Sequence, residues 1–268
     1  MKCLLPYVLI VTCFSCKNTP PLFESLTPKQ TNLYFQNQVI GTTSLNILNY
    51  LYYYNGAGVA AGDFNNDGLN DLYFTANQSE DHLYLNLGDF KFKDITRVAN
   101  IDNTSPWTTG VTTVDINNDG LLDIYICKIG DYNTIKGHNL LYINNGVNND
   151  GIPIFKEESV RYGLDFRSFS TQSAFFDMDK DGDLDLFLLN HSLHPNSNYG
   201  KGDNRTRKDD ISGDKLFENI DGHFIDITTQ SGIFQGKIGY GLGLSISDIN
   251  NDGYPDIYVG NDFFENDY

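Results

Sequence analysis

The chain has 268 residues, which is enough for a large hydrophobic core in one or two domains. Its formal net charge is −17, and this excess of acid argues against nucleic acid as a partner, since phosphate binding needs a basic patch. The densest basic stretch, residues 201–208, is interrupted by Asp203 and followed by Asp209 and Asp210, so we interpret it as a solvated loop.

Residues 1–16 have the pattern of an export signal, with Lys2, an apolar run and then Ser15-Cys16. A small residue directly before Cys resembles a bacterial lipoprotein cleavage site and predicts lipid attachment at Cys16. The alternative is an ordinary secretory signal that is cleaved elsewhere. Either interpretation predicts an exported protein, on the outer membrane or cell surface or secreted, that contacts a membrane only through an N-terminal lipid. Residues 17–28 are interpreted as a tether.

Three of the four cysteines lie in the signal region, which leaves Cys127 alone in the body of the chain. One thiol cannot form an internal disulfide, so metal ions and packing must stabilise the fold. Cys127 falls in an apolar run, and we expect it to be a small buried hydrophobic residue.

A nine-residue pattern, Asp-x-Asn/Asp-x-Asp-Gly-x-x-Asp, occurs four times, and an apolar and aromatic run follows each copy. The copies, called loops 1 to 4 here, begin at Asp63, Asp115, Asp177 and Asp248. The oxygen ligands that we predict, counting the seventh residue for its backbone carbonyl, are Asp63, Asn65, Asp67, Leu69 and Asp71 in loop 1; Asp115, Asn117, Asp119, Leu121 and Asp123 in loop 2; Asp177, Asp179, Asp181, Asp183 and Asp185 in loop 3; and Asp248, Asn250, Asp252, Tyr254 and Asp256 in loop 4.

Oxygen ligands in this number favour Ca²⁺, which takes about 6–8 of them, over Mg²⁺, which requires a stricter octahedron. The pattern predicts about four bound calcium ions. An EF-hand is excluded because the twelfth position, which needs Glu, is apolar in every copy. The alternative is a set of Asn-Asp-Gly turns without an ion, but that does not explain the additional Asp at the ninth position.

The flanks of each loop are short and rich in Val, Ile, Tyr, Phe and Leu, which predicts strands on both sides. Hairpin phrases follow at Leu83, Leu141 and Leu216, giving four antiparallel strands per unit. Loop spacings of 52, 62 and 71 residues favour the blades of a β-propeller, an all-β fold. The additional length falls between strands two and three of each unit, which places the insertions on one face, often the binding face.

We assign residues 29–268 to about three and a half such blades, with the fourth cut short, and therefore expect a fragment of a longer protein. The stretch Phe23–Thr27 has the character of a fourth strand and is predicted to complete the last blade.

The phrase GVAAGDFNNDGLNDLYFTAN, with LYLNLGDFKFKDIT after it, resembles the FG-GAP/VCBS repeats of integrin α-like heads and bacterial surface proteins. Within that family the chain is most similar to the cartilage acidic protein and ASPIC/UnbV group of exported bacterial proteins. The resemblance implies a seven-bladed propeller with calcium at the loop positions named above.

The sequence shows no catalytic constellation, so we expect no enzyme activity. His191 and His194 are interpreted as loop histidines rather than as a metal pair. The leading hypothesis is a calcium-stabilised propeller that binds an extracellular protein or a glycan. Alternatives are a region that presents substrate within a larger polysaccharide-processing or hydrolytic protein, and a purely structural spacer. Four tyrosines near the N-terminus are expected to pack in the first blade rather than to stack on sugars; they are Tyr50, Tyr52, Tyr53 and Tyr54.

Overall fold

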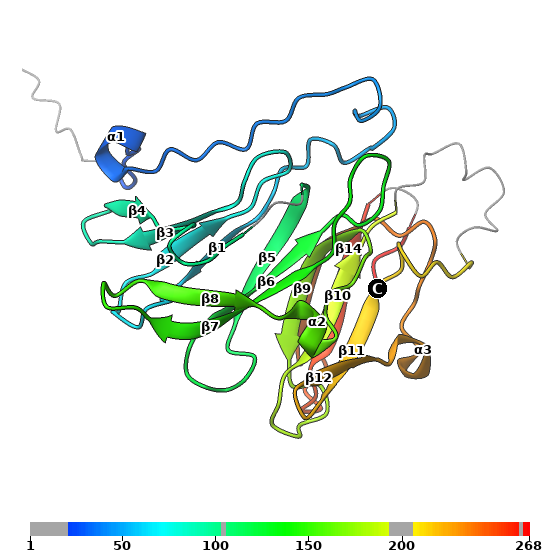
Figure 1. The fold of residues 1–268 in the computed structure, drawn as a ribbon. Helices are drawn as coiled ribbons and strands as arrows, with labels where there is room; N and C mark the ends of the chain where they lie inside the picture. The colour runs from blue at the N-terminus through cyan, green and yellow to red at the C-terminus, as the bar shows by residue number, and fades with distance from the viewer. Residues whose placement is uncertain (1–20, 103–105, 193–205, 263–264) are drawn as a thin grey trace, which may run out of the picture.

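The computed structural model describes residues 21–102, 106–192, 206–262 and 265–268 (Figure 1). The signal segment, Cys16 and His194 lie outside the described residues. Strands make up most of the regular secondary structure in the described chain, which also has three helices of one turn: α1 (Pro28–Thr31), α2 (Ser159–Tyr162) and α3 (Thr228–Ser231). None of the helices within the described residues has the length and apolar character needed to span a membrane.

The strands form separate antiparallel sheets in which every strand pairs with the next one along the chain. The first sheet contains β1 (Val59–Gly62), β2 (Asp71–Phe74), β3 (His82–Asn86) and β4 (Phe92–Asp94). The second contains β5 (Thr108–Val114), β6 (Asp123–Lys128), β7 (Leu140–Val147) and β8 (Pro153–Glu157). The third contains β9 (Ser170–Phe176), β10 (Asp185–Asn190), β11 (Lys215–Ile220) and β12 (His223–Asp226). A fourth pairs β13 (Gly241–Ser247) with β14 (Asp256–Asn261). We call these sheets blades 1 to 4.

The expected unit of four antiparallel strands is therefore confirmed in three blades, and blade 4 contains its first two strands. The first strands of the blades, β1, β5, β9 and β13, lie next to one another in chain order. This arrangement is that of propeller blades around an axis, although the described strands do not close a ring.

The second strand of each central blade is apolar on both faces because a neighbouring blade covers each face. Every residue of β6 and of β10 is buried. One apolar cluster joins blades 1 and 2 around Tyr73 and Ile124, and another joins blades 2 and 3 around Tyr125 and Leu186. A third cluster joins blades 3 and 4 around Phe187. Hydrophobic burial thus falls mainly between blades.

The prediction that Phe23–Thr27 forms a strand is wrong for this structure. These residues pair with no strand, and the Phe23 side chain is 86% exposed. Thr27 instead begins α1 through a capping box with Gln30, and Pro28 occupies the first turn, where its missing N–H costs nothing.

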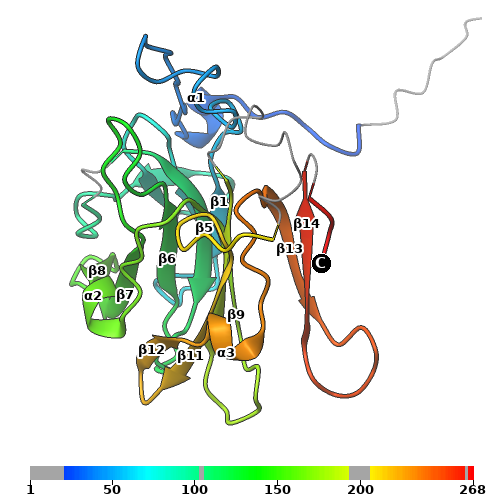
Figure 2. The same ribbon diagram turned by 90° about the vertical axis from the view of Figure 1, so that its right-hand side faces the viewer.

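The chain from residue 32 to residue 58 forms a strap rather than a blade, since no strand precedes Val59 in the described residues. The strap crosses one end of the blades, seen at the top of Figures 1 and 2. It is held by hydrogen bonds from the Ile40 N–H to Gln78 Oε1 at 2.7 Å and from Asn37 Nδ2 to Asn77 Oδ1 at 2.8 Å. The Tyr132 hydroxyl donates to the Asn49 carbonyl, which ties the strap to the insertion of blade 2.

Candidate metal-binding loops

Loops 1 to 4 connect the first and second strands of their blades, at the end of the blades opposite the strap. Figure 2 shows the loops between β9 and β10 and between β13 and β14 at the bottom of the view. The fourth residue of every loop is left-handed, with φ between 56° and 67°. The sixth is glycine with φ from 84° to 100°, a conformation that other residues rarely adopt.

Within loop 1 the side-chain oxygens turn inward and accept hydrogen bonds from the loop backbone. Asp63 Oδ1 accepts the Asp67 N–H at 3.0 Å, and its Oδ2 accepts the Gly68 N–H at 2.7 Å. Asp67 in turn accepts the Leu69 N–H at 2.8 Å. Loops 2 and 4 repeat the same bonds, so the sequence pattern specifies one backbone shape.

The ninth residue has a structural role that the sequence pattern did not reveal. Asp71 is fully buried; it accepts the Phe64 N–H at 3.1 Å with one oxygen and the Asn86 N–H of β3 at 2.7 Å with the other. Asp123 and Asp185 link their loops to β7 and β11 in the same way. Burial raises the pKa of Asp71 and of Asp123 to about 6, although these hydrogen bonds favour the charged form.

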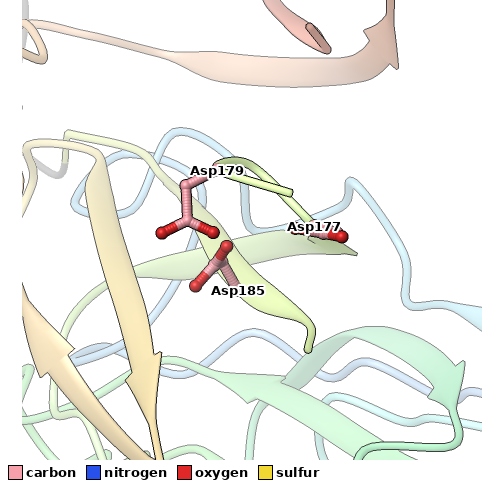
Figure 3. Close-up of side chains that lie close together, drawn as sticks. All are labelled: Asp177, Asp179 and Asp185. Atoms are coloured by element: carbon pink, nitrogen blue, oxygen red, sulfur yellow. The ribbon is translucent and has the colours of Figure 1, made fainter. Parts of the chain in front are cut away.

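Loop 3 differs because its third residue is Asp179 where the other loops have Asn. In loops 1, 2 and 4 that Asn donates its Nδ2 to the carboxylate of the fifth residue, at 2.9–3.0 Å. Asp179 cannot donate. Carboxylate oxygens of Asp177, Asp179 and Asp185 lie within 4.8 Å of one another (Figure 3). Among the described residues, loops 1, 2 and 4 do not bring three acidic side chains together in this way, because their third residue is Asn.

Two carboxylate oxygens of loop 3 are buried without a hydrogen-bond partner in the described structure. They are Asp177 Oδ1 and Asp183 Oδ1. Burial, together with repulsion from Asp181 and Asp185, raises the pKa of Asp183 to about 6. Buried oxygens that lack a donor are costly unless a cation neutralises them, so this donor set fits a divalent metal ion.

A second repeated position escaped the sequence analysis. In blades 1 to 3 the residue just before the third strand accepts a backbone N–H from the end of the second strand, and Asp267 accepts the same bond after β14 of blade 4. Asp81 accepts from Ala76, Asn139 from Lys128, Asp214 from Asn190 and Asp267 from Asn261, each at 2.8 Å. The available signal was an Asp or Asn two residues before the Leu that opens each hairpin phrase.

The opposite end of the blades, where the insertions lie, is capped by aromatic side chains of the strap. Tyr50, Tyr52 and Tyr53 are buried in a cluster with Trp107, whereas Tyr54 is 61% exposed. Three of the four tyrosines therefore pack as expected, but across the ends of several blades rather than within the first, and the expectation is wrong for Tyr54. Beneath them lies a cavity of about 460 Å³, lined by the first strands of all four blades and without charged side chains.

His191 belongs to this aromatic cap and is buried, with 1% of its surface exposed. Its Nε2 lies 3.1 Å from the Tyr50 hydroxyl and its Nδ1 lies 3.0 Å from the Ser192 carbonyl. The carbonyl can only accept, so Nδ1 carries the proton and Nε2 accepts from Tyr50. Both ring nitrogens thus have protein partners, which argues against a metal ligand.

The bladed sheets and repeated acidic loops define a class of all-β repeat protein. Residues 63–126 match the FG-GAP-like repeat family, and residues 240–268 match the FG-GAP repeat family. The chain therefore carries FG-GAP-type repeats, as the resemblance of its first unit indicated. The comparison with curated proteins gave no match.

Proposed function

We propose that this chain is a calcium-stabilised, non-enzymatic binding module of propeller type, exported and anchored by a lipid at Cys16. The observation that carries the calcium proposal is the donor set of loop 3: three carboxylates within 4.8 Å and two buried oxygens without a hydrogen-bond partner in the described structure. Calcium would supply a positive charge at each loop and no chemical step. Loops 1, 2 and 4 offer the same positions with two carboxylates fewer, because Asn replaces Asp179 and Leu or Tyr replaces Asp183.

The ninth Asp would transmit calcium binding to the rest of its blade. Its carboxylate touches the loop on one side and the third strand on the other, as the contacts of Asp71 with Phe64 and Asn86 illustrate. A cation that holds this side chain ionised strengthens both hydrogen bonds. Calcium would therefore stabilise the hairpin of strands three and four as well as the loop, and its binding free energy would add to folding.

The proposed partner is an extracellular protein or a glycan. Support for a binding role comes from the FG-GAP repeats, since FG-GAP repeat domains are often involved in binding. The candidate surface for binding the partner is the outer edge of the strap-covered end of the blades. Tyr54 is exposed there, next to the buried aromatic cap. The axis itself is covered there by the strap.

The proposal predicts that Asp67→Ala removes one calcium ion from the protein. Asp67 supplies a candidate ligand of loop 1 and also accepts the Leu69 N–H, so its loss should abolish that site and loosen blade 1. Calorimetric titration should show one site fewer than in the parent chain. Asn70→Ala is the matched control, because Asn70 lies in the same loop outside the proposed ligands. An unchanged number of sites in Asp67→Ala would contradict the ligand assignment.

A further inference from the structure

The fourth residue of each loop has a left-handed backbone, and in loop 3 alone it is not asparagine. Asn66, Asn118 and Asn251 have φ of 57°, 56° and 60°, and Lys180 has φ of 67°. Asparagine tolerates this conformation, whereas a long side chain such as lysine is disfavoured there. A lysine at this position therefore calls for a compensating contact.

That contact is made with the next blade. Lys180 Nζ lies 3.7 Å from the centroid of the Tyr254 ring, in the geometry of a cation–π interaction. A Cβ placed on Gly253 would lie 3.3 Å from the same nitrogen. Tyr254 is the seventh residue of loop 4, at the position where loops 1 and 2 have leucine. The ammonium group of loop 3 thus rests against the backbone and ring of loop 4.

A corresponding contact between neighbouring loops joins blades 1 and 2, but it involves no charged side chain. Asn66, the fourth residue of loop 1, donates its Nδ2 to the Gly120 carbonyl at 3.2 Å. Gly120 is the sixth residue of loop 2, as Gly253 is the sixth residue of loop 4. The side chain of the fourth residue therefore reaches the loop of the following blade in both places.

The charge of Lys180 faces the proposed ligands of loop 4. Its ammonium group lies over the Tyr254 ring and beside Gly253, and these two residues directly follow the proposed ligand Asp252. A cation that favours an ionised carboxylate also repels a second cation placed beside it. The positive charge of Lys180 would therefore repel a calcium ion bound in loop 4.

We propose that Lys180 sets the calcium affinity of loop 4, lowering it so that loop 4 fills at a higher calcium concentration than its own ligands would require. The proposal rests on calcium binding by the loops, as proposed above. Lys180 is an affinity-determining residue and not a ligand, since it acts on the neighbouring blade.

The test uses terbium as a luminescent substitute for calcium, because Tyr254 is the one tyrosine within the four loops and can sensitise an ion bound beside it. Displacement of terbium by Ca²⁺ then gives the affinity of loop 4 in the full chain. Tyr254→Leu, which installs the residue of loops 1 and 2, identifies the loop 4 signal. Calorimetry of the chain with and without Asp252→Ala gives the same affinity by difference.

Lys180→Asn, which installs the residue of the other loops, should tighten calcium binding at loop 4 about fivefold at low salt. Lys180→Arg should retain the weak affinity of the parent chain. The effect of Lys180→Asn should shrink near 1 M salt, where the Debye length is about 3 Å. Asn251→Ser, at the fourth position of loop 4 itself, is the matched control and should leave the affinity nearly unchanged.

An unchanged or weaker affinity of loop 4 in Lys180→Asn, with calcium still bound at the other loops, overturns this inference alone. A tightening that persists in high salt would also contradict it, because the effect would not be electrostatic. Absence of calcium binding by any loop in any variant would remove the proposed function together with the inference.

Discussion

At the scale of single residues, the ninth Asp of each loop and the Asp or Asn before each third strand act as joints. Each accepts backbone N–H groups that would otherwise lose their partners at a strand end, as Asp71 and Asp81 do. Burial raises the pKa of Asp71 and of Asp81 to about 6. Charge at these joints therefore has to be balanced by a cation or by a neighbouring basic group.

His191 gives the structure a specific dependence on pH. Burial lowers its pKa from 6.5 to about 4. Below pH 6.5 the unfolded chain takes up a proton that the folded chain excludes, so stability falls as pH decreases from about 6.5 to 4. Between pH 7.5 and pH 5 this residue should cost about 2 kcal/mol.

The matched variant is His191→Gln, which does not titrate and retains an acceptor for the Tyr50 hydroxyl. The Gln side chain supplies this acceptor through its Oε1 oxygen. Urea unfolding of both proteins at pH 7.5 and pH 5 in excess calcium should show a smaller loss in the variant. Equal losses would mean that the ring is not held neutral by the fold.

At the scale of elements, the second strands of the blades share a design but differ at the residue that follows the apolar run. Asn190 and Asn261 occupy this position in blades 3 and 4 and Ala76 occupies it in blade 1, whereas blade 2 has Lys128. Lys128 is fully buried; burial lowers its pKa to about 8, and the nearby Asp81 of blade 1 opposes that shift. The charges of Asp81 and Lys128 thus attract each other between blades 1 and 2, since each favours the ionised form of the other.

Asp81→Asn should destabilise the protein by about 3 kcal/mol, because it leaves the buried Lys128 without its carboxylate. The double variant Asp81→Asn, Lys128→Asn should recover most of that loss, since it installs residues that the other blades use at these positions. Urea unfolding of the parent, both single variants and the double variant measures the coupling. Additive losses in the double variant would contradict the pairing.

Much of the blade organisation was predictable, because four loops in register and three hairpin phrases fix the order of the strands. The stretch at Phe23–Thr27 misled because its likeness to a fourth strand is local, whereas a strand also needs a neighbour to pair with. The joint at Asp81 was missed because its partner, the Ala76 N–H, becomes apparent only once the strands are in place. The additional carboxylates of loop 3, Asp179 and Asp183, can be read from the sequence, but the burial of an Asp183 oxygen depends on how the loop folds.

At the scale of the whole molecule, the strap of residues 32–58 connects blades that otherwise touch only their neighbours. Tyr50 stacks on His191 of blade 3, with ring centroids 5.7 Å apart, and lies 5.5 Å from the Trp107 ring at the start of blade 2. Tyr52 packs edge-on against Tyr240, next to blade 4. In a repeat protein whose blades contact only their neighbours, a cap that touches several blades makes unfolding more cooperative.

Tyr50→Ala should therefore destabilise the protein by about 3 kcal/mol, the usual cost of removing a large buried aromatic side chain. Tyr54→Ala, an exposed tyrosine of the same segment, should change stability by less than about 0.5 kcal/mol. Urea unfolding followed by the fluorescence of Trp107, the single tryptophan, reports on the cap directly. Equal effects of the two variants would show that the strap does not hold the blades.

Calcium binding is the central claim, and calorimetric titration of the full chain with Ca²⁺, together with thermal melts with and without a chelator, tests it most directly. The account predicts about four sites, with loop 3 the tightest, and a large fall in melting temperature when calcium is removed. No heat of binding and no change in melting temperature would mean that the loops are bare turns, and the calcium proposal would be wrong.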